Sequence, residues 1–353
     1  MTSPPDGLAV VIVTYESAAH VGATLRAPAG QLREDDELLV IDNASTDATA
    51  DEVEAAAPRA RLIGLDENVG FAPACNLAAE RTQAPLLLFL NPDAVPAPGC
   101  LDQLRSAASL QPDWGAWQAL VTLPGGERVN TSGGLLHYLG FGWTGQPGEP
   151  VEQVGERPRE IAFASGAALA VRRRAWQELG GFDRDYFMYG EDVDLALRLR
   201  LRGWGVGVTP GARVEHDYEF EKGTRKWFLL ERNRWRTLLV DYPAGLLVPL
   251  LPLLLLLELA LLAVAARGGW LRAKLRAQAR TLGSLPSLLA RRRQVQRGRT
   301  AGARELAVWL QAELDSPYLP MPGWLRPLSW AQELYWRALR RPLLGRSRSR
   351  APD

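Results

Sequence analysis

Short apolar runs alternate with segments of helical composition through the first part of the chain, and this alternation restricts the fold more than any other feature. The run Leu8–Thr14 (LAVVIVT) is continuous and rich in β-branched residues, as expected for a strand buried on both faces. Further strands are predicted at Glu37–Ile41, Arg61–Leu65 and Pro85–Leu90, with a helix at Phe71–Arg81. Another helix after Asp42-Asn43 is predicted, capped by Ser45 or Asp47. Strands separated by helices predict an α/β fold with a mostly parallel sheet and right-handed crossovers.

Polar residues follow several of these predicted strands. In parallel sheets ligands bind beyond the carboxyl ends of the strands. The residues to inspect first are therefore Thr14, Asp42, Asn91 and Asp93. A nicotinamide-dependent dehydrogenase is excluded, because the first strand leads into TYESAAHVG and not into a glycine-rich phosphate-binding turn.

The amino-acid composition changes in the middle of the chain. Residues 122–160 are rich in Gly and Pro, and we expect a hairpin-bearing insertion over the sheet. Regular structure is predicted to resume at Ile161, and Glu191–Arg202 is predicted to form an amphipathic helix.

The C-terminal part begins with a strongly apolar stretch, Leu246–Ala266, of 21 residues with one charge. Its prolines, Pro249 and Pro252, are expected to break the first turns and leave Leu253–Ala266 as the helix. Such a helix would be about 21 Å long, short of a ~30 Å bilayer core. Both flanks are basic, so we favour a monotopic or re-entrant helix, with a true span and a buried core helix left open. Short helices are expected at Ala303–Leu314 and Trp330–Leu339.

Charge and cysteine usage bound the function classes. The formal net charge of +1 gives no support to nucleic-acid binding. Arginine nevertheless dominates from Arg267 onward, which favours an anionic membrane surface as partner. Cys75 and Cys100 lack metal-like spacing and suggest a reducing compartment. The start, MTSPPDG, lacks the pattern of a signal peptide, so we expect a cytoplasmic location.

Three acidic features and one histidine are candidates for chemistry, and each has a plainer structural alternative. Asp42 could accept hydrogen bonds from a ribose or a base, or could only shape a turn. Asp93 could hold a divalent cation against a diphosphate, or Asn91-Pro92-Asp93 could simply end a strand. His216 could complete that metal site or be structural.

The third acidic feature is Glu191-Asp192, followed by Asp194, at the start of a predicted helix. Acidic residues there could do no more than satisfy the helix dipole. Alternatively, one carboxylate is a general base that deprotonates an acceptor hydroxyl.

The order of these features resembles a known family. The stretches are VIVTYES, VIDNASTD, ENVGFAPACN, FLNPDA and the long block FASGAALAVRRRAWQELGGFDRDYFMYGEDVDLALRLRLRGW. Over about Leu8 to Asp241 they resemble the family 2 glycosyltransferases, particularly the bacterial rhamnosyltransferase-like and galactofuranosyltransferase-like branch. The resemblance implies a GT-A nucleotide-diphospho-sugar transferase fold in residues 1–240. Residues 241–353 would form a helical, membrane-associating region.

The resemblance also implies roles for individual residues. Asp192 would be the catalytic base, with Glu191 beside it orienting or binding the acceptor. Asp93 and His216 would hold Mg²⁺ or Mn²⁺, with Asn91 in place of the first Asp of the family's DxD motif. The donor nucleotide would contact Thr14, Tyr15, Glu16, Asp42, Asn68, Gly70, Phe71 and Asn91, and the acceptor side would include Gly166 and Trp204.

The activity implied is a single displacement with inversion at the anomeric carbon. Processive synthases carry Gln-x-x-Arg-Trp, whereas Glu231 takes the place of the Gln here, so we expect addition of one sugar. The donor would be dTDP-rhamnose, UDP-galactofuranose or another UDP-hexose, and the acceptor a glycan or polyprenyl-linked saccharide at the cytoplasmic face of the cell membrane. The alternative is a non-catalytic, sugar-nucleotide-binding membrane scaffold.

Overall fold

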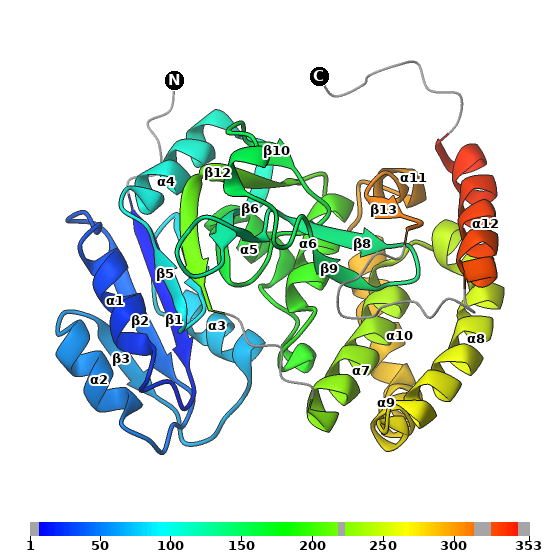
Figure 1. Cartoon of the computed structure of the whole chain (residues 1–353), viewed down its shortest axis with the longest axis horizontal. Helices are drawn as coiled ribbons and strands as arrows, with labels where there is room; N and C mark the ends of the chain where they lie inside the picture. Colours follow the sequence, from blue (N-terminus) through cyan, green and yellow to red (C-terminus); the bar gives the residue numbers. More distant parts are fainter. Residues whose placement is uncertain (1–6, 218–222, 314–325, 345–353) are drawn as a thin grey trace. The chain divides into compact units, whose positions relative to one another are not determined.

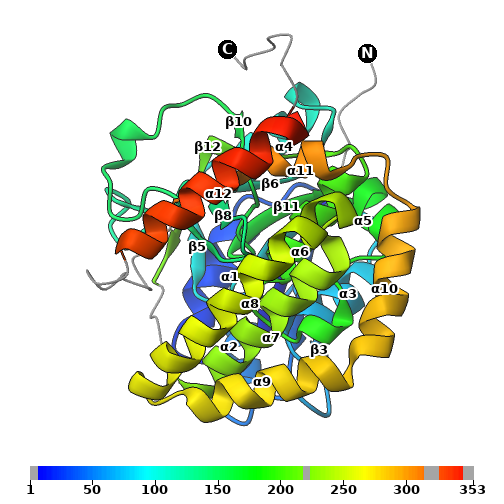
Figure 2. The ribbon, with the colours of Figure 1, turned by 90° about the vertical axis from the view of Figure 1, so that its right-hand side faces the viewer.

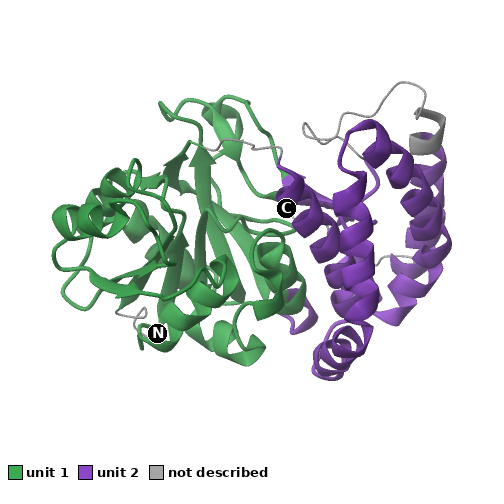
Figure 3. Cartoon of the chain, turned by 90° about the horizontal axis from the view of Figure 1, so that it is seen from below, with its two compact units in different colours: residues 1–134, 144–199, 204–220 green, residues 135–143, 200–203, 221–353 purple. Residues whose placement is uncertain are grey.

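The structure is a computed structural model that describes residues 7–217, 223–313 and 326–344. Figure 1 shows its helices and strands in chain order. The chain divides into two compact units, drawn in two colours in Figure 3. Unit 1 comprises Met1–Gly134, Thr144–Leu199 and Trp204–Phe220, and unit 2 comprises Leu135–Trp143, Arg200–Gly203 and Glu221–Asp353. The division at residue 240 expected from the sequence stays a prediction.

Unit 1 is built on a sheet of ten strands among the described residues, with the order β10-β12-β6-β11-β4-β1-β2-β3, while β5 pairs with β12 and β7 with β6. Strands β3, β2, β1 and β4 are mutually parallel, β12 is parallel to β6, and β11 is antiparallel to both of its neighbours. The strands are β1 (Leu8–Thr14), β2 (Glu37–Asp42), β3 (Arg61–Gly64), β4 (Leu86–Leu90), β5 (Ala94–Pro96), β6 (Trp114–Thr122), β7 (Val129–Thr131), β10 (Arg159–Glu160), β11 (Ala168–Arg172) and β12 (Gly205–His216).

The helices of unit 1 alternate with the first strands, as predicted. They are α1 (Val21–Ala29), α2 (Thr49–Ala56), α3 (Phe71–Glu80), α4 (Cys100–Leu110), α5 (Arg173–Leu179) and α6 (Glu191–Leu201, whose last two residues fall in unit 2), with 3₁₀ turns at Val151–Gln153 and Arg184–Tyr186. The N-cap of α2 is Ala48 and not Ser45 or Asp47, although the Asp47 carboxylate accepts a hydrogen bond from the Thr49 N–H at 3.0 Å. The Ser45 hydroxyl instead donates to Asp42 and accepts a hydrogen bond from the Glu16 N–H at 3.0 Å.

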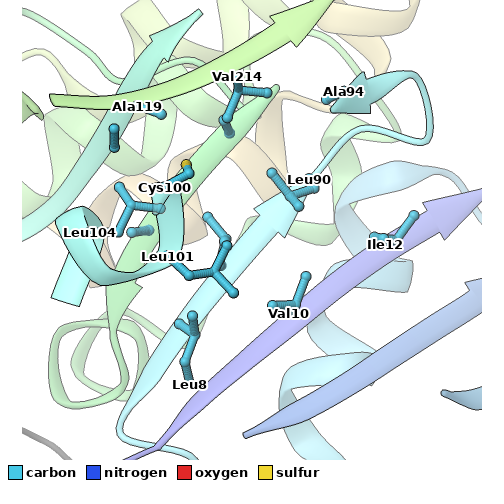
Figure 4. Packing of buried hydrophobic residues seen from close by; sticks show 14 of the residues in the cluster. Leu8, Val10, Ile12, Leu90, Ala94, Cys100, Leu101, Leu104, Ala119 and Val214 are labelled. Carbon is cyan, nitrogen blue, oxygen red and sulfur yellow. The ribbon is translucent and has the colours of Figure 1, made fainter. Parts of the chain in front are cut away.

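The apolar core of unit 1 explains why continuous apolar runs became central strands. Every residue of β1 and β4 is buried. Figure 4 shows side chains of β1 and β4 meeting those of α4, with labelled residues Leu8, Val10, Ile12, Leu90, Leu101 and Leu104 in one cluster. Burial of this kind contributes roughly 25 cal/mol per Å² of apolar surface. The carboxyl ends of these strands are thereby fixed, which positions the polar residues that follow them.

A hairpin enters the Gly- and Pro-rich stretch from the main sheet, since β6, which ends at Thr122, and β7 pair antiparallel with Val121 opposite Thr131. Within the described residues, two further short strands of this stretch, β8 (Gly134–His137) and β9 (Gly142–Thr144), form a three-stranded sheet with β13 (Leu310–Gln311). These strands are two to four residues long, which is why no period-2 pattern marks them in the sequence.

Unit 2 is mainly helical, with α7 (Thr224–Asp241), α8 (Ala244–Arg267), α9 (Leu271–Gly283), α10 (Leu285–Arg297), α11 (Ala303–Ala307) and α12 (Arg326–Leu344). The predicted helix at Ala303–Leu314 is correct only as far as Ala307, because β13 follows at Leu310. The last residue of the predicted range, Leu314, lies outside the described residues. The helix predicted at Trp330–Leu339 exists and is longer, as α12.

The apolar stretch differs from the prediction in one respect. Helix α8 continues through Pro249 and Pro252 and covers 24 residues. Each proline removes one backbone hydrogen bond, at a cost near 3 kcal/mol. The inward side chains Leu246, Leu247, Leu250 and Leu254 pack through the same turns and offset that cost. By length and composition α8 alone, among the described residues, could cross a membrane.

Candidate active site

The loops that follow β1 and β2 are joined by hydrogen bonds to Asp42. Thr14 and Asp42 are partners in the β1–β2 register, and the Thr14 hydroxyl donates to Asp42 Oδ1 at 3.1 Å. The Ser45 N–H donates to Asp42 Oδ2 at 3.3 Å, and its hydroxyl also donates to this carboxylate. Asp42 therefore shapes its turn, yet a carboxylate offers about four acceptor positions, and one stays available for a ligand hydroxyl.

The loop after β1 extends this rim. The Glu16 carboxylate accepts hydrogen bonds from the N–H and the hydroxyl of Thr46, at 2.8 and 2.9 Å. Glu16 itself has a positive φ of 50°, an uncommon conformation for a residue with a side chain. Its neighbour Tyr15 is exposed, so its ring is free of the core and is available to stack on a planar base.

A second pair of loops is held by two asparagines. Asn43 donates to Asn68 Oδ1 at 3.0 Å and accepts from the Val69 N–H at 2.9 Å. Asn68 also accepts from the Gly70 N–H at 3.0 Å. Gly70 has φ +94°, and a Cβ built there would lie 2.6 Å from the ring of Phe187. Only glycine fits at this position, directly before Phe71 and the start of α3.

The predicted metal ligands are brought together by sheet pairing. Residues Asn91 to Asp93 follow β4, and β5 then pairs antiparallel with the end of β12, with Ala94 opposite His216. His216 Nε2 lies 3.0 Å from Asp93 Oδ1 and 3.3 Å from Asn91 Nδ2. His216 is buried, whereas Asp93 is half-buried and reaches solvent.

This donor set fits a divalent cation that is completed by its substrate. Among the described residues, no group of three or more His, Cys, Asp or Glu side chains is arranged so that it could hold a metal ion by itself. Asp93 and His216 would supply two ligands, and a Mg²⁺ or Mn²⁺ ion commonly takes the rest from phosphate oxygens and water. The amide oxygen of Asn91 could join after a rotation of its side chain, since its nitrogen now faces the imidazole.

The acidic pair lies at the start of α6, beside Gly166. The Gly166 N–H donates to Asp192 Oδ2 at 3.3 Å, and a Cβ on Gly166 would come to 3.9 Å from Glu191 Oε1 and 3.8 Å from the Phe71 ring. The Asn91 N–H donates to the Ala167 carbonyl at 3.1 Å. The segment Gly166-Ala167, just before β11, thus connects Asn91 to the acidic pair.

The two neighbouring carboxyls differ in their environments. Burial, reinforced by the charges of Asp192 and then Asp194, raises the pKa of Glu191 to about 8. Burial also raises the pKa of Asp192, but hydrogen bonds from the Val193 and Gly166 N–H groups oppose that rise. At neutral pH Glu191 is therefore mostly protonated while Asp192 is the carboxyl better able to ionise. Environments that separate two pKa values in this way assign acid and base roles.

Helix α6 is anchored behind the pair by Arg198, which the sequence reasoning missed. Arg198 Nε donates to Asp194 Oδ2 at 2.8 Å inside the fold, and Nη1 donates to the carbonyl of Gly181 at 3.0 Å. The Gly180-Gly181 turn has two positive φ angles, as expected for glycines that serve a backbone turn. An i, i+4 Asp–Arg spacing is visible in the sequence and could have identified Arg198.

The loop before α6 is strained. Phe187 has φ 60° and ψ −66°, and the Met188 N–H donates to the Tyr186 carbonyl across it at 2.6 Å, which makes a γ-turn of the rare type. Tyr189 also has a positive φ, of 68°. Strain of this kind gathers at functional sites, and here it stands directly before the acidic pair.

The structure does not bring Trp204 to this site. Trp204 follows the C-terminal end of α6, about 14 Å of helix from Asp192, and its indole N–H donates to Glu178 at 2.9 Å. Two residues that the sequence analysis missed lie closer to the site. Asn43, in the loop after β2, binds Asn68, and Asn130 donates to the His216 carbonyl at 3.4 Å. Asn43 could have been identified in the sequence because it directly follows Asp42 in the motif VIDNASTD. Asn130 lies in a stretch without a recognisable pattern, so no sequence signal identifies it.

Known proteins resemble this chain in sequence. The family model described as "Glycosyltransferase like family 2" matches residues 4–238. An N-acetylglucosaminyl-diphospho-decaprenol L-rhamnosyltransferase of Mycobacterium tuberculosis is 33% identical over 233 residues, which cover 60% of this chain and 76% of that protein. The O-antigen biosynthesis protein RfbC of Myxococcus xanthus is 32% identical over 171 residues, 45% of this chain and 13% of RfbC.

Solved structures resemble it in fold. S. aureus TarS 1-349 aligns with a TM-score of 0.51 at 15% identity, over 96% of this chain and 90% of that one. GalNAc-T7 with UDP, GalNAc and Mn²⁺ aligns with a TM-score of 0.52 at 18% identity, over 66% of this chain and 47% of that one. The predicted family and the predicted GT-A fold are both confirmed. With its family model matched over well more than half of its length, the chain belongs to the family 2 glycosyltransferases.

Proposed function

We propose that this glycosyltransferase moves a single sugar from a nucleotide-diphosphate sugar, of the dTDP-rhamnose or UDP-hexose type, to a hydroxyl of a lipid-linked saccharide or cell-surface glycan. The observation that carries the proposal is the meeting of Asp93 and His216, from the ends of β4 and β12, with Asn91 at hydrogen-bond distance. Residues distant in sequence bring a carboxylate and an imidazole together at the carboxyl edge of the sheet, where α/β folds bind nucleotides.

On the donor side, Asp42 with Thr14 would take the nucleoside, and Asn68, Gly70 and Phe71 would border its pocket. Asp93 and His216 would hold Mg²⁺ or Mn²⁺, which stabilises the negative charge that develops on a departing diphosphate. The exposed ring of Tyr15 stands at the same rim, as a stacking surface for the base.

On the acceptor side, Asp192 acts as the general base. It takes the proton of the acceptor hydroxyl while that oxygen forms its bond to the anomeric carbon, and the bond to the diphosphate breaks with its electron pair going to the diphosphate. Attack from the face opposite the leaving group inverts the anomeric centre. Glu191, held protonated by burial, leaves Asp192 as the single base and offers an O–H donor to the acceptor.

The acceptor class is inferred from the relatives and from the C-terminal region. The Mycobacterium tuberculosis relative is named for N-acetylglucosaminyl-diphospho-decaprenol, a lipid-linked substrate. Helix α8 is long and apolar. A polyprenyl-linked acceptor at the cytoplasmic face of the cell membrane agrees with both.

The test is calorimetric titration of UDP and dTDP into the full chain with and without Mn²⁺, followed by transfer assays with the matching sugar nucleotides and a polyprenyl-diphosphate-GlcNAc analogue. We expect metal-dependent binding of one nucleotide, lost in Asp93→Ala and kept in the control Asp51→Ala on the exposed surface of α2. Binding of neither nucleotide would overturn the donor site. Binding without transfer to any acceptor would favour a non-catalytic, sugar-nucleotide-binding membrane scaffold.

A further inference from the structure

Helix α8 has two faces of different composition. The inward face carries Leu246, Leu247, Leu250, Leu254, Glu258, Leu261 and Ala265. The outward face carries large apolar side chains that are 38–66% exposed, namely Val248, Leu251, Leu255, Leu256 and Leu259. At 100° per residue these five fall within an arc of about 140°. Within α8, which the structure describes in full, that outer face carries no charge, and an apolar surface of this extent marks an interaction site.

The single carboxylate of α8 is drawn away from the outer face by a buried ion cluster. Glu258 Oε1 pairs with Arg234 of α7, and Oε2 accepts from Lys274 of α9 at 2.7 Å. Glu231 of α7 accepts from Arg234 and from Lys274, each at 2.8 Å. Two carboxylates thus balance two cations, and Lys274 is fully buried.

The cluster also constrains the orientation of α8 in a membrane. Arg234 and Glu231 belong to α7, and Lys274 belongs to α9, so α8 is joined along its inner face to two polar helices. If α8 crossed a bilayer, Arg234 and Lys274, which bind Glu258 in the second half of the helix, would be drawn toward the hydrocarbon with it. Since each charged side chain there costs several kcal/mol, the helix is arranged to lie along a membrane and not across it.

The charge of the segments that contain and follow α8 favours an anionic membrane. From Tyr242 to Arg304 the sequence holds ten arginines and one lysine but only one acidic residue, Glu258, which is neutralised in the cluster. Surface arginines next to an apolar face are attracted to anionic headgroups, at about 1 kcal/mol for each residue near the surface in typical membranes.

Helix α12 adds an anchor of the type found at membrane interfaces. Figure 2 shows α12 above α8, and the two helices are linked where the Tyr335 hydroxyl donates to the Pro249 carbonyl. Trp330 and Leu334 of α12 are exposed. Tryptophan and tyrosine are enriched where the headgroups meet the acyl chains.

We infer that the outer face of α8, flanked by the arginines of α9 and the aromatic residues of α12, lies in the plane of an anionic lipid surface. This extends the proposed function, on which it rests for the idea that the acceptor is held in a membrane, and it names the element that holds the enzyme there. The inner face of α8 stays within the protein through the Glu258 cluster.

The test is flotation of the full chain with vesicles of phosphatidylcholine alone or with phosphatidylglycerol added. We expect binding to the anionic vesicles, weakened by salt, and at least about tenfold weaker for Leu255→Ser/Leu259→Ser because two exposed leucines leave the lipid. The matched control is Leu110→Ser on α4, where the leucine is 69% exposed in unit 1. Arg272→Glu/Arg276→Glu should abolish the preference for anionic lipid, and Arg59→Glu, on the surface of unit 1, should leave it intact.

Two outcomes would overturn the inference: equal binding to both vesicles, or no loss of binding in the α8 variant. Circular dichroism of each variant separates lost binding from lost folding. These readouts do not involve sugar transfer. If the chain transfers sugar to a soluble acceptor but does not bind vesicles, the membrane-binding inference is refuted and the proposed function is not. If the chain floats with vesicles but binds no nucleotide, the proposed function is refuted and the membrane-binding inference is not.

Discussion

Replacing Glu191 by Gln should stabilise the protein in a pH-dependent way. Glu191 is buried at the start of α6, and within the described residues its Oε2 atom has no hydrogen-bond partner. Burial, with the charge of Asp192, raises its pKa from an ordinary value of 4.5 to about 8. Gln is nearly the same size and stays neutral at every pH. The wild type therefore loses stability on ionisation, and the variant does not.

The sign and size follow from proton linkage. Between pH 4.5 and 8 the unfolded chain has released the Glu191 proton and the folded chain keeps it. The stability contributed by this group is complete below pH 4.5 and falls as pH rises towards 8, at about 1.4 kcal/mol per pH unit. From pH 5.5 to 7.5 the wild type should lose about 2–3 kcal/mol relative to Glu191→Gln.

The assay is urea unfolding at half-unit pH steps, comparing the wild type, Glu191→Gln and the exposed control Glu54→Gln on α2. The quantity to follow is the difference in unfolding free energy between each variant and the wild type. It should grow with pH for Glu191→Gln and stay flat for Glu54→Gln. A flat difference for both variants would show that Glu191 is ionised in the folded protein, and the assignment of Asp192 as the single base would fail with it.

Four other changes test separate parts of the structure. Asp192→Asn should lower kcat by about 10²–10⁴ without changing nucleotide affinity, as measured by transfer assay and calorimetry, because it removes only the base. Asp93→Ala should remove the metal dependence of nucleotide binding in calorimetry. Gly70→Ala should destabilise the fold by about 1–3 kcal/mol in urea and weaken nucleotide binding, since its Cβ would meet Phe187 at 2.6 Å at a positive φ. Glu258→Gln should cost about 3 kcal/mol in thermal unfolding by leaving Lys274 unbalanced, and adding Lys274→Met should recover most of it.

The central sheet could be predicted because its buried strands correspond to continuous apolar stretches of the sequence. The prediction for β1 matches Leu8–Thr14 at both ends, and that for β4 differs by one residue. The edge where Asp42 and Asp93 lie followed from strand order alone, since carboxyl ends of parallel strands share one side. Local pattern was sufficient there because each strand is buried on both faces.

Contacts between distant segments could not be predicted in the same way. The meeting of His216 with Asp93 depends on β5 pairing with β12, two segments separated by more than a hundred residues. The continuity of α8 depends on packing of its inner leucines, which outweighs the local effect of Pro249. Both are tertiary effects that override local propensity.

The start of α6 carries acidic residues that bear on folding and, in the proposed mechanism, on catalysis. Three carboxyls, Glu191, Asp192 and Asp194, are crowded there, and their mutual repulsion would destabilise the helix if all were charged and unpaired. Asp194 is neutralised by Arg198, which also holds the turn at Gly181, so this part of the helix is fixed. Glu191 is relieved by keeping its proton, at a cost in stability that grows with pH. Asp192 is then the carboxyl that can ionise beside a neutral Glu191, and its proposed role as a base depends on that neutral state.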